Sequence, residues 1–137
     1  MFNGKLRLEA YIPDEWVVLA FFTFIAMAPN PKIVVPRGFI TDLASIPRML
    51  RWLFDVNGIS RQAAVLHDYL YSTQPLSRAD SDALFLEALK ALKASKWECF
   101  GLYYGVRIGG WWAWYKHKSY GLSDNFVSES YWADEAA

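Results

Sequence analysis

The segment that decides the fold is Arg61-Gln62-Ala63-Ala64-Val65-Leu66-His67-Asp68-Tyr69-Leu70-Tyr71. It reads as an amphipathic helix that carries a histidine and a carboxylate within an apolar run. Because an α-helix has about 3.6 residues per turn, Ala64, His67 and Tyr71 share one face, whereas Asp68 points about 100° away from His67. The side chains of His67 and Asp68 therefore point toward different parts of the protein and are not expected to contact each other. Such a pair is compatible with a structural role and with a catalytic one.

The composition predicts one folded domain that spans residues 1–137. Of these residues 54% are hydrophobic and 18% are aromatic, which argues against disorder and is enough for a real core. The chain contains seven tryptophans and eight tyrosines. Their rings indicate either a core built from amphipathic side chains or a surface that meets a partner or a lipid interface.

The net charge of the whole chain is zero, but the charges are unevenly distributed along the sequence. Residues 121–137 contain four acidic side chains and no lysine or arginine, so residues 1–120 carry 14 − 10 = +4. This excess is too mild for a nucleic-acid partner, which needs a concentrated basic stripe. The single cysteine, Cys99, excludes an intrachain disulfide and fits synthesis in a reducing cytoplasm.

The N-terminal part, residues 4–36, predicts a small antiparallel sheet. Residues 4–11 alternate polar and apolar side chains, as expected for a strand with one solvated face. The apolar run 16–28 follows an acidic pair and is too short to span a membrane, so we expect one or two buried strands and no targeting signal. Lys32–Val35 predicts a third strand that ends at a proline.

A site loop, residues 37–47, leads from this sheet to a helical part, residues 48–117, and to an acidic polar tail, residues 121–137. The loop contains Asp42, which suits a helix cap or turn and equally a metal ligand. Helices are predicted from 48 to 54, through His67 to residues 73–75, from 78 onward, and from 97 to 117. The predicted class is thus α+β, with three to four packed helices that include an antiparallel helical hairpin.

Asp82 continues the apolar stripe of the helix after residue 77, so its carboxylate needs a partner inside the protein. A short loop joins this helix to the preceding one, and His67 and Asp82 lie at nearly the same distance from that loop. We therefore expect a hydrogen bond between them, which would leave one ring nitrogen free to act as a general base. Arg107 is a candidate partner for Asp42 or Asp68.

Four motifs read together resemble an uncharacterised family encoded by tailed bacteriophages and prophages. They are Gly38-Phe39-Ile40-Thr41-Asp42-Leu43-Ala44-Ser45-Ile46-Pro47-Arg48, Ala63-Ala64-Val65-Leu66-His67-Asp68-Tyr69-Leu70-Tyr71, Leu76-Ser77-Arg78-Ala79 and Gly109-Gly110-Trp111. The resemblance covers about residues 5 to 115. It implies a phage protein and no particular activity.

The segment His67-Asp68-Tyr69-Leu70-Tyr71 also resembles the His-Asp-x-x-Tyr signature of phospholipase A2-like proteins. This resemblance implies that His67 is the general base, that Asp82 orients it, that Tyr71 supports the pair and that Asp68 binds calcium. The glycine-rich calcium loop of that family is missing here, so Asp42 would have to replace its carbonyl ligands. A hard cation of this kind takes oxygen ligands and polarises an ester carbonyl.

Two functions follow as expectations. The first is a virion component of the tail, baseplate or neck, in which the Asp and His side chains pin the loop to the helices and aromatic side chains contact other virion proteins in an oligomeric assembly. The second is a calcium-assisted hydrolase of lipid or cell-envelope esters. For both we expect Asp42, His67, Asp68 and Asp82 to converge. An open pocket at His67 would favour the hydrolase, whereas a sealed cluster would favour the virion component.

Overall fold

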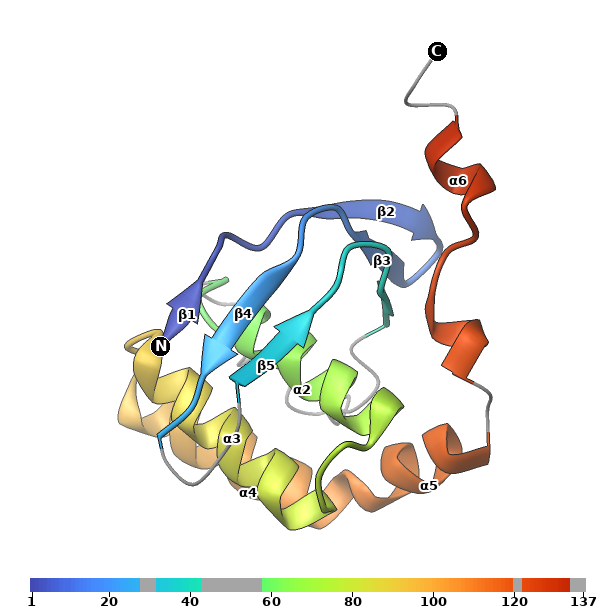
Figure 1. The fold of residues 1–137 in the computed structure, drawn as a ribbon. Coiled ribbons are helices and arrows are strands. Elements are labelled where there is room, and N and C mark those ends of the chain that lie inside the picture. Colours follow the sequence, from blue (N-terminus) through green and yellow to red (C-terminus); the bar gives the residue numbers. More distant parts are fainter. Residues whose placement is uncertain (28–31, 43–57, 120–121, 134–137) are drawn as a thin grey trace.

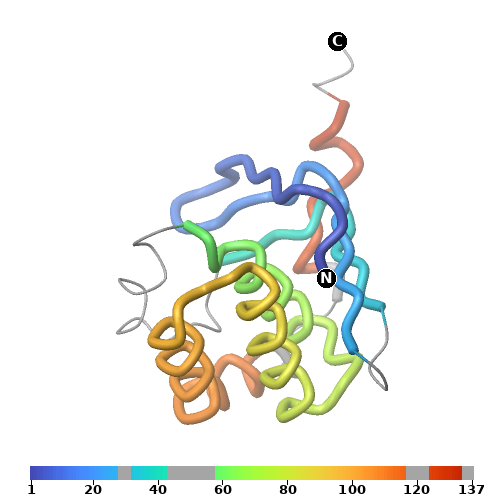
Figure 2. The backbone as a smooth tube through the Cα atoms, turned by 90° about the vertical axis from the view of Figure 1, so that its left-hand side faces the viewer, coloured from blue at the N-terminus to red at the C-terminus, as the bar shows by residue number. Residues whose placement is uncertain are grey.

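The computed structural model describes residues 1–27, 32–42, 58–119 and 122–133 and has the predicted α+β architecture (Figure 1). Strands occupy the N-terminal part of the chain, and helices follow. The strands lie over one side of the helices, with α2 (Arg61–Thr73) directly against them (Figure 1 and Figure 2). The predicted helix at 48–54 falls outside the described residues.

Within the described residues the strands form two three-stranded antiparallel sheets instead of one. The first sheet has the order β1 (Phe2–Asn3), β4 (Phe22–Ile25) and β5 (Lys32–Val35). The second has the order β2 (Leu8–Ile12), β3 (Glu15–Val18) and β6 (Ile40–Thr41). Strands β1 and β6 lie outside the predicted range 4–36.

The division into two sheets occurs inside the apolar run 16–28. This run supplies both β3 and β4, which pair with different neighbours: β3 with β2 and β6, and β4 with β1 and β5. Strand β5 is the predicted third strand. Its side chains alternate, because Ile33 and Val35 are buried whereas Lys32 and Val34 are exposed. Phe22 pairs with Val35 and Phe24 with Ile33, which places large apolar side chains on the helix side.

The core lies between the strands and α2. Fully buried side chains from both layers meet there, among them Phe22, Phe24, Phe39, Leu66 and Leu70. Helix α3 (Arg78–Ala91) packs on α2 as the predicted hairpin, and α4 (Lys96–Gly109) packs on α3. Burial of this continuous apolar surface is the main source of stability for the fold.

The predicted helix 97–117 is two helices in the structure, α4 and α5 (Trp111–Ser119), with Gly110 between them. A β-carbon at Gly110 would lie only 2.8 Å from the Tyr71 hydroxyl of α2. A glycine is therefore needed where the chain passes closest to α2, and the helix axis changes direction there. Helix α5 packs against both α2 and α4.

The acidic tail is docked on the second sheet through η2 (Leu122–Asn125) and the residues after it. The backbone of Val127 donates to the carbonyl of Gly38, and the Arg37 guanidinium lies 3.7 Å from the centre of the Trp132 ring. Gly38 has a φ of +92°, which favours glycine. The last helix, α6 (Ser130–Ala133), points away from the body of the molecule (Figure 1).

Candidate functional site

The predicted hydrogen bond between His67 and Asp82 is confirmed. Nε2 of His67 on α2 lies 2.6 Å from Oδ1 of Asp82 on α3, and neither side chain has exposed surface. Helix α3 is placed by its N-cap, since the Ser77 hydroxyl accepts from the backbone of Asp80 at 3.1 Å. Ser60 stands at the start of α2, but its side chain makes no capping hydrogen bond.

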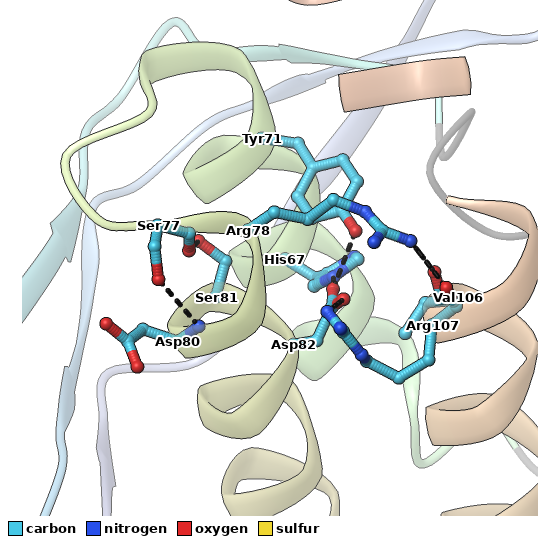
Figure 3. Close-up of polar contacts among 9 residues, drawn as sticks. All are labelled: His67, Tyr71, Ser77, Arg78, Asp80, Ser81, Asp82, Val106 and Arg107. Atoms are coloured by element: carbon cyan, nitrogen blue, oxygen red, sulfur yellow. Dashed lines mark hydrogen bonds and ion pairs between the residues drawn. The ribbon is translucent and has the colours of Figure 1, made fainter. Parts of the chain in front are cut away.

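Asp82 is the centre of the site because three side chains donate to it (Figure 3). The Tyr71 hydroxyl donates to Oδ1 at 2.6 Å, and Nη1 of Arg107 on α4 donates to Oδ2 at 2.8 Å. Both carboxylate oxygens are thus engaged. We refer to His67, Tyr71, Asp82 and Arg107 as the Asp82 cluster; it joins α2, α3 and α4.

Arg107 therefore has a different partner from the predicted one, since it binds Asp82 and neither Asp42 nor Asp68 in this contact. Asp82 was not among the partners predicted for Arg107, because its carboxylate was assigned to His67. The choice depends on how α4 packs against α3, which orients Arg107 toward the second turn of α3. Its side chain is 33% exposed, so it reaches the buried carboxylate from the surface.

Arg78 is a further member of this region that the sequence interpretation missed. Its guanidinium donates to the backbone carbonyls of Arg107 at 2.5 Å and Val106 at 3.2 Å (Figure 3). A cation at the C-terminal end of a helix satisfies carbonyls that have no partner within the helix. The sequence did contain one indication of a role for Arg78, its position in the Leu76-Ser77-Arg78-Ala79 motif. Capping of α3 explains Ser77 in that motif but not Arg78.

Aromatic rings enclose the imidazole of His67. The ring centres of Tyr71 and Phe85 lie 4.2 and 4.6 Å from that of His67, and Trp114 of α5 covers Tyr71 edge-on at 5.1 Å. His67 is consequently fully buried. The cluster is sealed under an arginine and a tryptophan, which is the arrangement expected for a structural role.

The protonation states follow from burial and from these contacts. Burial lowers the pKa of His67, and the hydrogen bond to Asp82 opposes this only in part. Burial acts to raise the pKa of Asp82, but hydrogen bonds from His67, Tyr71 and Arg107 outweigh it and hold that pKa below its ordinary value. The pair is thus a neutral imidazole and a carboxylate, so Nε2–H of His67 donates.

Nδ1 of His67 is then an unprotonated acceptor, and no side chain or backbone group among the described residues donates to it. This is the nitrogen that a general base would use, and the arrangement of a histidine oriented by a carboxylate suits proton abstraction. The burial of His67 leaves no surface through which water or substrate reaches it in this structure.

Asp68 lies on another sector of α2, as predicted, and has a separate role in the contacts described here. Its Oδ2 accepts from the Thr41 hydroxyl of β6 at 2.6 Å, and both side chains are buried. This bond ties the second sheet to α2. Of the four residues expected to converge, His67 binds Asp82 and Asp68 binds Thr41, while Asp42 follows Thr41 in the chain and is half-buried.

The residues do not fit the calcium site that the phospholipase resemblance implies. Among the described residues, no three side chains of His, Cys, Asp or Glu are grouped so that they could hold a metal ion. Calcium takes six to eight oxygen ligands, whereas Asp68 already uses one oxygen for Thr41.

Comparison with known proteins gives one match. A family model described as "Protein of unknown function (DUF1353)" matches residues 16–106, well over half of the chain. The match contains every member of the Asp82 cluster except Arg107, which follows it directly. No curated protein and no solved structure matches the chain. Within the described residues, no helix is long and apolar enough to cross a membrane.

Proposed function

The chain belongs to the DUF1353 family of proteins of unknown function, and we therefore propose its function from the site itself. The proposal is a non-catalytic component of a tailed-bacteriophage particle, in the tail, the baseplate or the neck. In this role the Asp82 cluster fixes the packing of α2, α3 and α4. Exposed aromatic side chains contact neighbouring virion subunits in an oligomeric assembly.

The burial of His67 is the observation that carries the non-catalytic role. A general base must reach its proton donor directly or through one water, whereas His67 has no exposed surface. Both oxygens of Asp82 are engaged by donors from two other helices. A buried polar network with its carboxylate fully satisfied specifies one packing arrangement, which suits a structural module.

One side of α4 supports a role in assembly. Four large apolar residues recur there at helical spacing, with exposed fractions of 83, 63, 47 and 76%; they are Trp97, Phe100, Tyr104 and Ile108. We call them the α4 face. Exposed apolar patches of this kind mark protein interaction sites. Tryptophan and tyrosine are also enriched at protein interfaces.

The phage origin is supported by the four motifs that resemble the tailed-phage family. Three of them fall in the parts that organise the site: Thr41 donates to Asp68, His67 binds Asp82, and Arg78 caps α4. The motif residues thus include the side chains that hold the sheet and the helices together.

The direct test is the composition of purified particles of the phage or induced prophage that encodes the chain. Mass spectrometry should detect the protein at a fixed copy number per particle. Ile108→Ser should reduce its incorporation without changing its thermal stability, because the side chain is exposed. Met27→Ser, at a residue 75% exposed outside the α4 face, is the matched control. Absence of the wild-type protein from intact particles would contradict the proposal.

A second candidate is a hydrolase in which His67 is the general base, and the direct contact with Asp82 favours it. The Tyr71 hydroxyl also supports Asp82, as the phospholipase resemblance implies. Such an enzyme needs a conformation in which water reaches Nδ1. Release of fatty acid from mixed phospholipid vesicles, with calcium and with chelator, tests it. Turnover that disappears in folded His67→Gln would establish the hydrolase and reject the non-catalytic role.

A further inference from the structure

A cavity of about 520 Å³ lies between α3 and α4, away from the Asp82 cluster. Its walls are apolar, with contributions from Leu86, Ala94, Cys99 and Phe100, and its rim carries Lys90 and Lys96. Pockets that bind small molecules have volumes of about 300–1,000 Å³ and are mostly apolar with a few polar groups. The cavity therefore has the size and the lining of a ligand site.

The charge at this cavity is one-sided. Lys90 and Lys96 are exposed, and neither forms an ion pair with any residue that the structure describes. Glu98 is the only acidic residue between positions 88 and 119. It is 6% exposed, and its carboxylate accepts from the backbone of Ser95 at 2.9 Å in the capping box of α4. Glu87 lies one turn before Lys90 on α3, but it does not line this cavity, and its Oε1 accepts from the backbone of Met27 at 2.7 Å. The charged side chains that line the cavity are thus both positive.

We propose that this cavity binds a small amphipathic anion, a single apolar chain with a carboxylate or phosphate head. The apolar chain lies against Leu86, Ala94 and Phe100, and the head pairs with Lys90 and Lys96. Burial of the chain provides most of the affinity, and the two ammonium groups select the sign of the head. The site belongs to the isolated protein. Phe100 and Tyr104 line this cavity and are also part of the α4 face, so a bound ligand and a neighbouring subunit would compete for them.

A cysteine in the cavity wall allows occupancy of the cavity to be measured chemically. Cys99 is the only cysteine of the chain, it lines the cavity, and it is 8% exposed. A bound chain would cover its thiol. Iodoacetamide is uncharged, so its rate of reaction with Cys99 measures access to the cavity without competing for the lysines.

The experiment compares decanoate with decyltrimethylammonium, which has the same chain and the opposite charge, by calorimetry below the micellar concentrations. Decanoate should bind with 1:1 stoichiometry and slow alkylation of Cys99. Octanoate, with two fewer methylene groups, should bind about fifteenfold more weakly. The cation should bind more weakly than decanoate does.

The lysines are tested with a double variant, Lys90→Gln with Lys96→Gln. Each exposed pair contributes a factor of up to about five, so decanoate should bind several-fold to about twentyfold more weakly. The control is Lys5→Gln with Lys32→Gln, which removes the same charge from exposed positions on the strand side of the molecule. All four lysines are exposed, so both variants should fold.

Three results would overturn the proposal. They are equal affinity for the anion and the cation, equal loss in the two double variants, and unchanged alkylation of Cys99 at saturating decanoate. Binding to vesicles of anionic phospholipid without binding of monomeric decanoate would also overturn it, because the surface would then recognise a membrane. The outcome is independent of whether the protein is found in particles.

Discussion

Nε2 of His67 lies 2.6 Å from Oδ1 of Asp82 in a part of the protein where neither side chain has exposed surface. A carboxylate in such a place is tolerated only if donors satisfy it, and Tyr71 and Arg107 complete the set. The cluster therefore stabilises one packing of α2, α3 and α4, and removal of Asp82 takes away the acceptor that its three donors share.

Asp82→Ala should destabilise the protein by about 3–5 kcal/mol, because it leaves buried donors unpaired and creates a cavity. Urea unfolding followed by circular dichroism measures the loss. Asp80→Asn is the control, since Asp80 lies on the same helix, is exposed, and should cost less than about 1 kcal/mol. Similar losses in the two variants would mean that the cluster contributes little to stability.

Stability should fall as the solution becomes acidic, beginning near pH 6.5. The pKa of folded His67 is lowered from 6.5, so between these two values the unfolded chain binds more protons and the free energy of unfolding decreases as pH falls. The slope attributable to one proton is at most about 1.4 kcal/mol per pH unit. The lowered pKa of Asp82 adds a further loss below about pH 3.8.

His67→Gln should flatten this dependence between pH 5 and 6.5 while it retains a donor for Asp82. Unfolding curves at half-unit intervals of pH measure the slope. The chain has a second histidine, His117, and the same series on His117→Gln separates the two. An unchanged slope in His67→Gln would show that His67 does not titrate in this range.

Thr41→Val should destabilise the protein by about 1.5–3 kcal/mol, because it removes the hydroxyl that donates to the buried Asp68 carboxylate while preserving side-chain shape. Thr23→Val provides the contrast. The Thr23 hydroxyl is buried on β4 and has no partner among the described residues, so its replacement should be neutral or stabilising. In thermal melts the melting temperature of Thr41→Val should therefore fall, whereas that of Thr23→Val should stay unchanged or rise.

Two adjacent glycines should respond with opposite sign. Gly109 is exposed in the last turn of α4, so Gly109→Ala should stabilise the helix by up to about 1 kcal/mol. In Gly110→Ala the new methyl group would lie 2.8 Å from the Tyr71 hydroxyl and 2.4 Å from the Val106 carbonyl oxygen, and the loss should be about 1–3 kcal/mol. Stabilisation by both substitutions would contradict the close approach of α5 and α2.

Local patterns predicted the elements that depend on nearby residues. The positions of α2 and α3 follow from periodicity and from Ser77, and the contact between His67 and Asp82 follows from counting helical rise on each side of a short loop. Strand β5 follows from alternation and a proline stop.

The features that the sequence did not predict depend on contacts between distant segments. The sequence of the run 16–28 does not predict that β3 and β4 belong to different sheets. Sheet membership depends on which other strands pair with each of them. Arg107 was expected to bind Asp42 or Asp68, and the packing of α4 on α3 places it against Asp82. The break at Gly110 arises from Tyr71, a residue of another helix.

The central claim is that the Asp82 cluster stabilises a scaffold and performs no reaction. With the phage origin proposed above, the most direct measurement is rescue of a phage that lacks this gene. The rescuing variant has an apolar cluster of similar size: His67→Leu, Tyr71→Phe, Asp82→Val and Arg107→Met. Replacing a complete buried ionic network by packed apolar side chains is often neutral or stabilising. We predict that the variant folds and restores infectious particles to nearly the wild-type titre. A folded, abundant variant that restores no infectivity would contradict the claim.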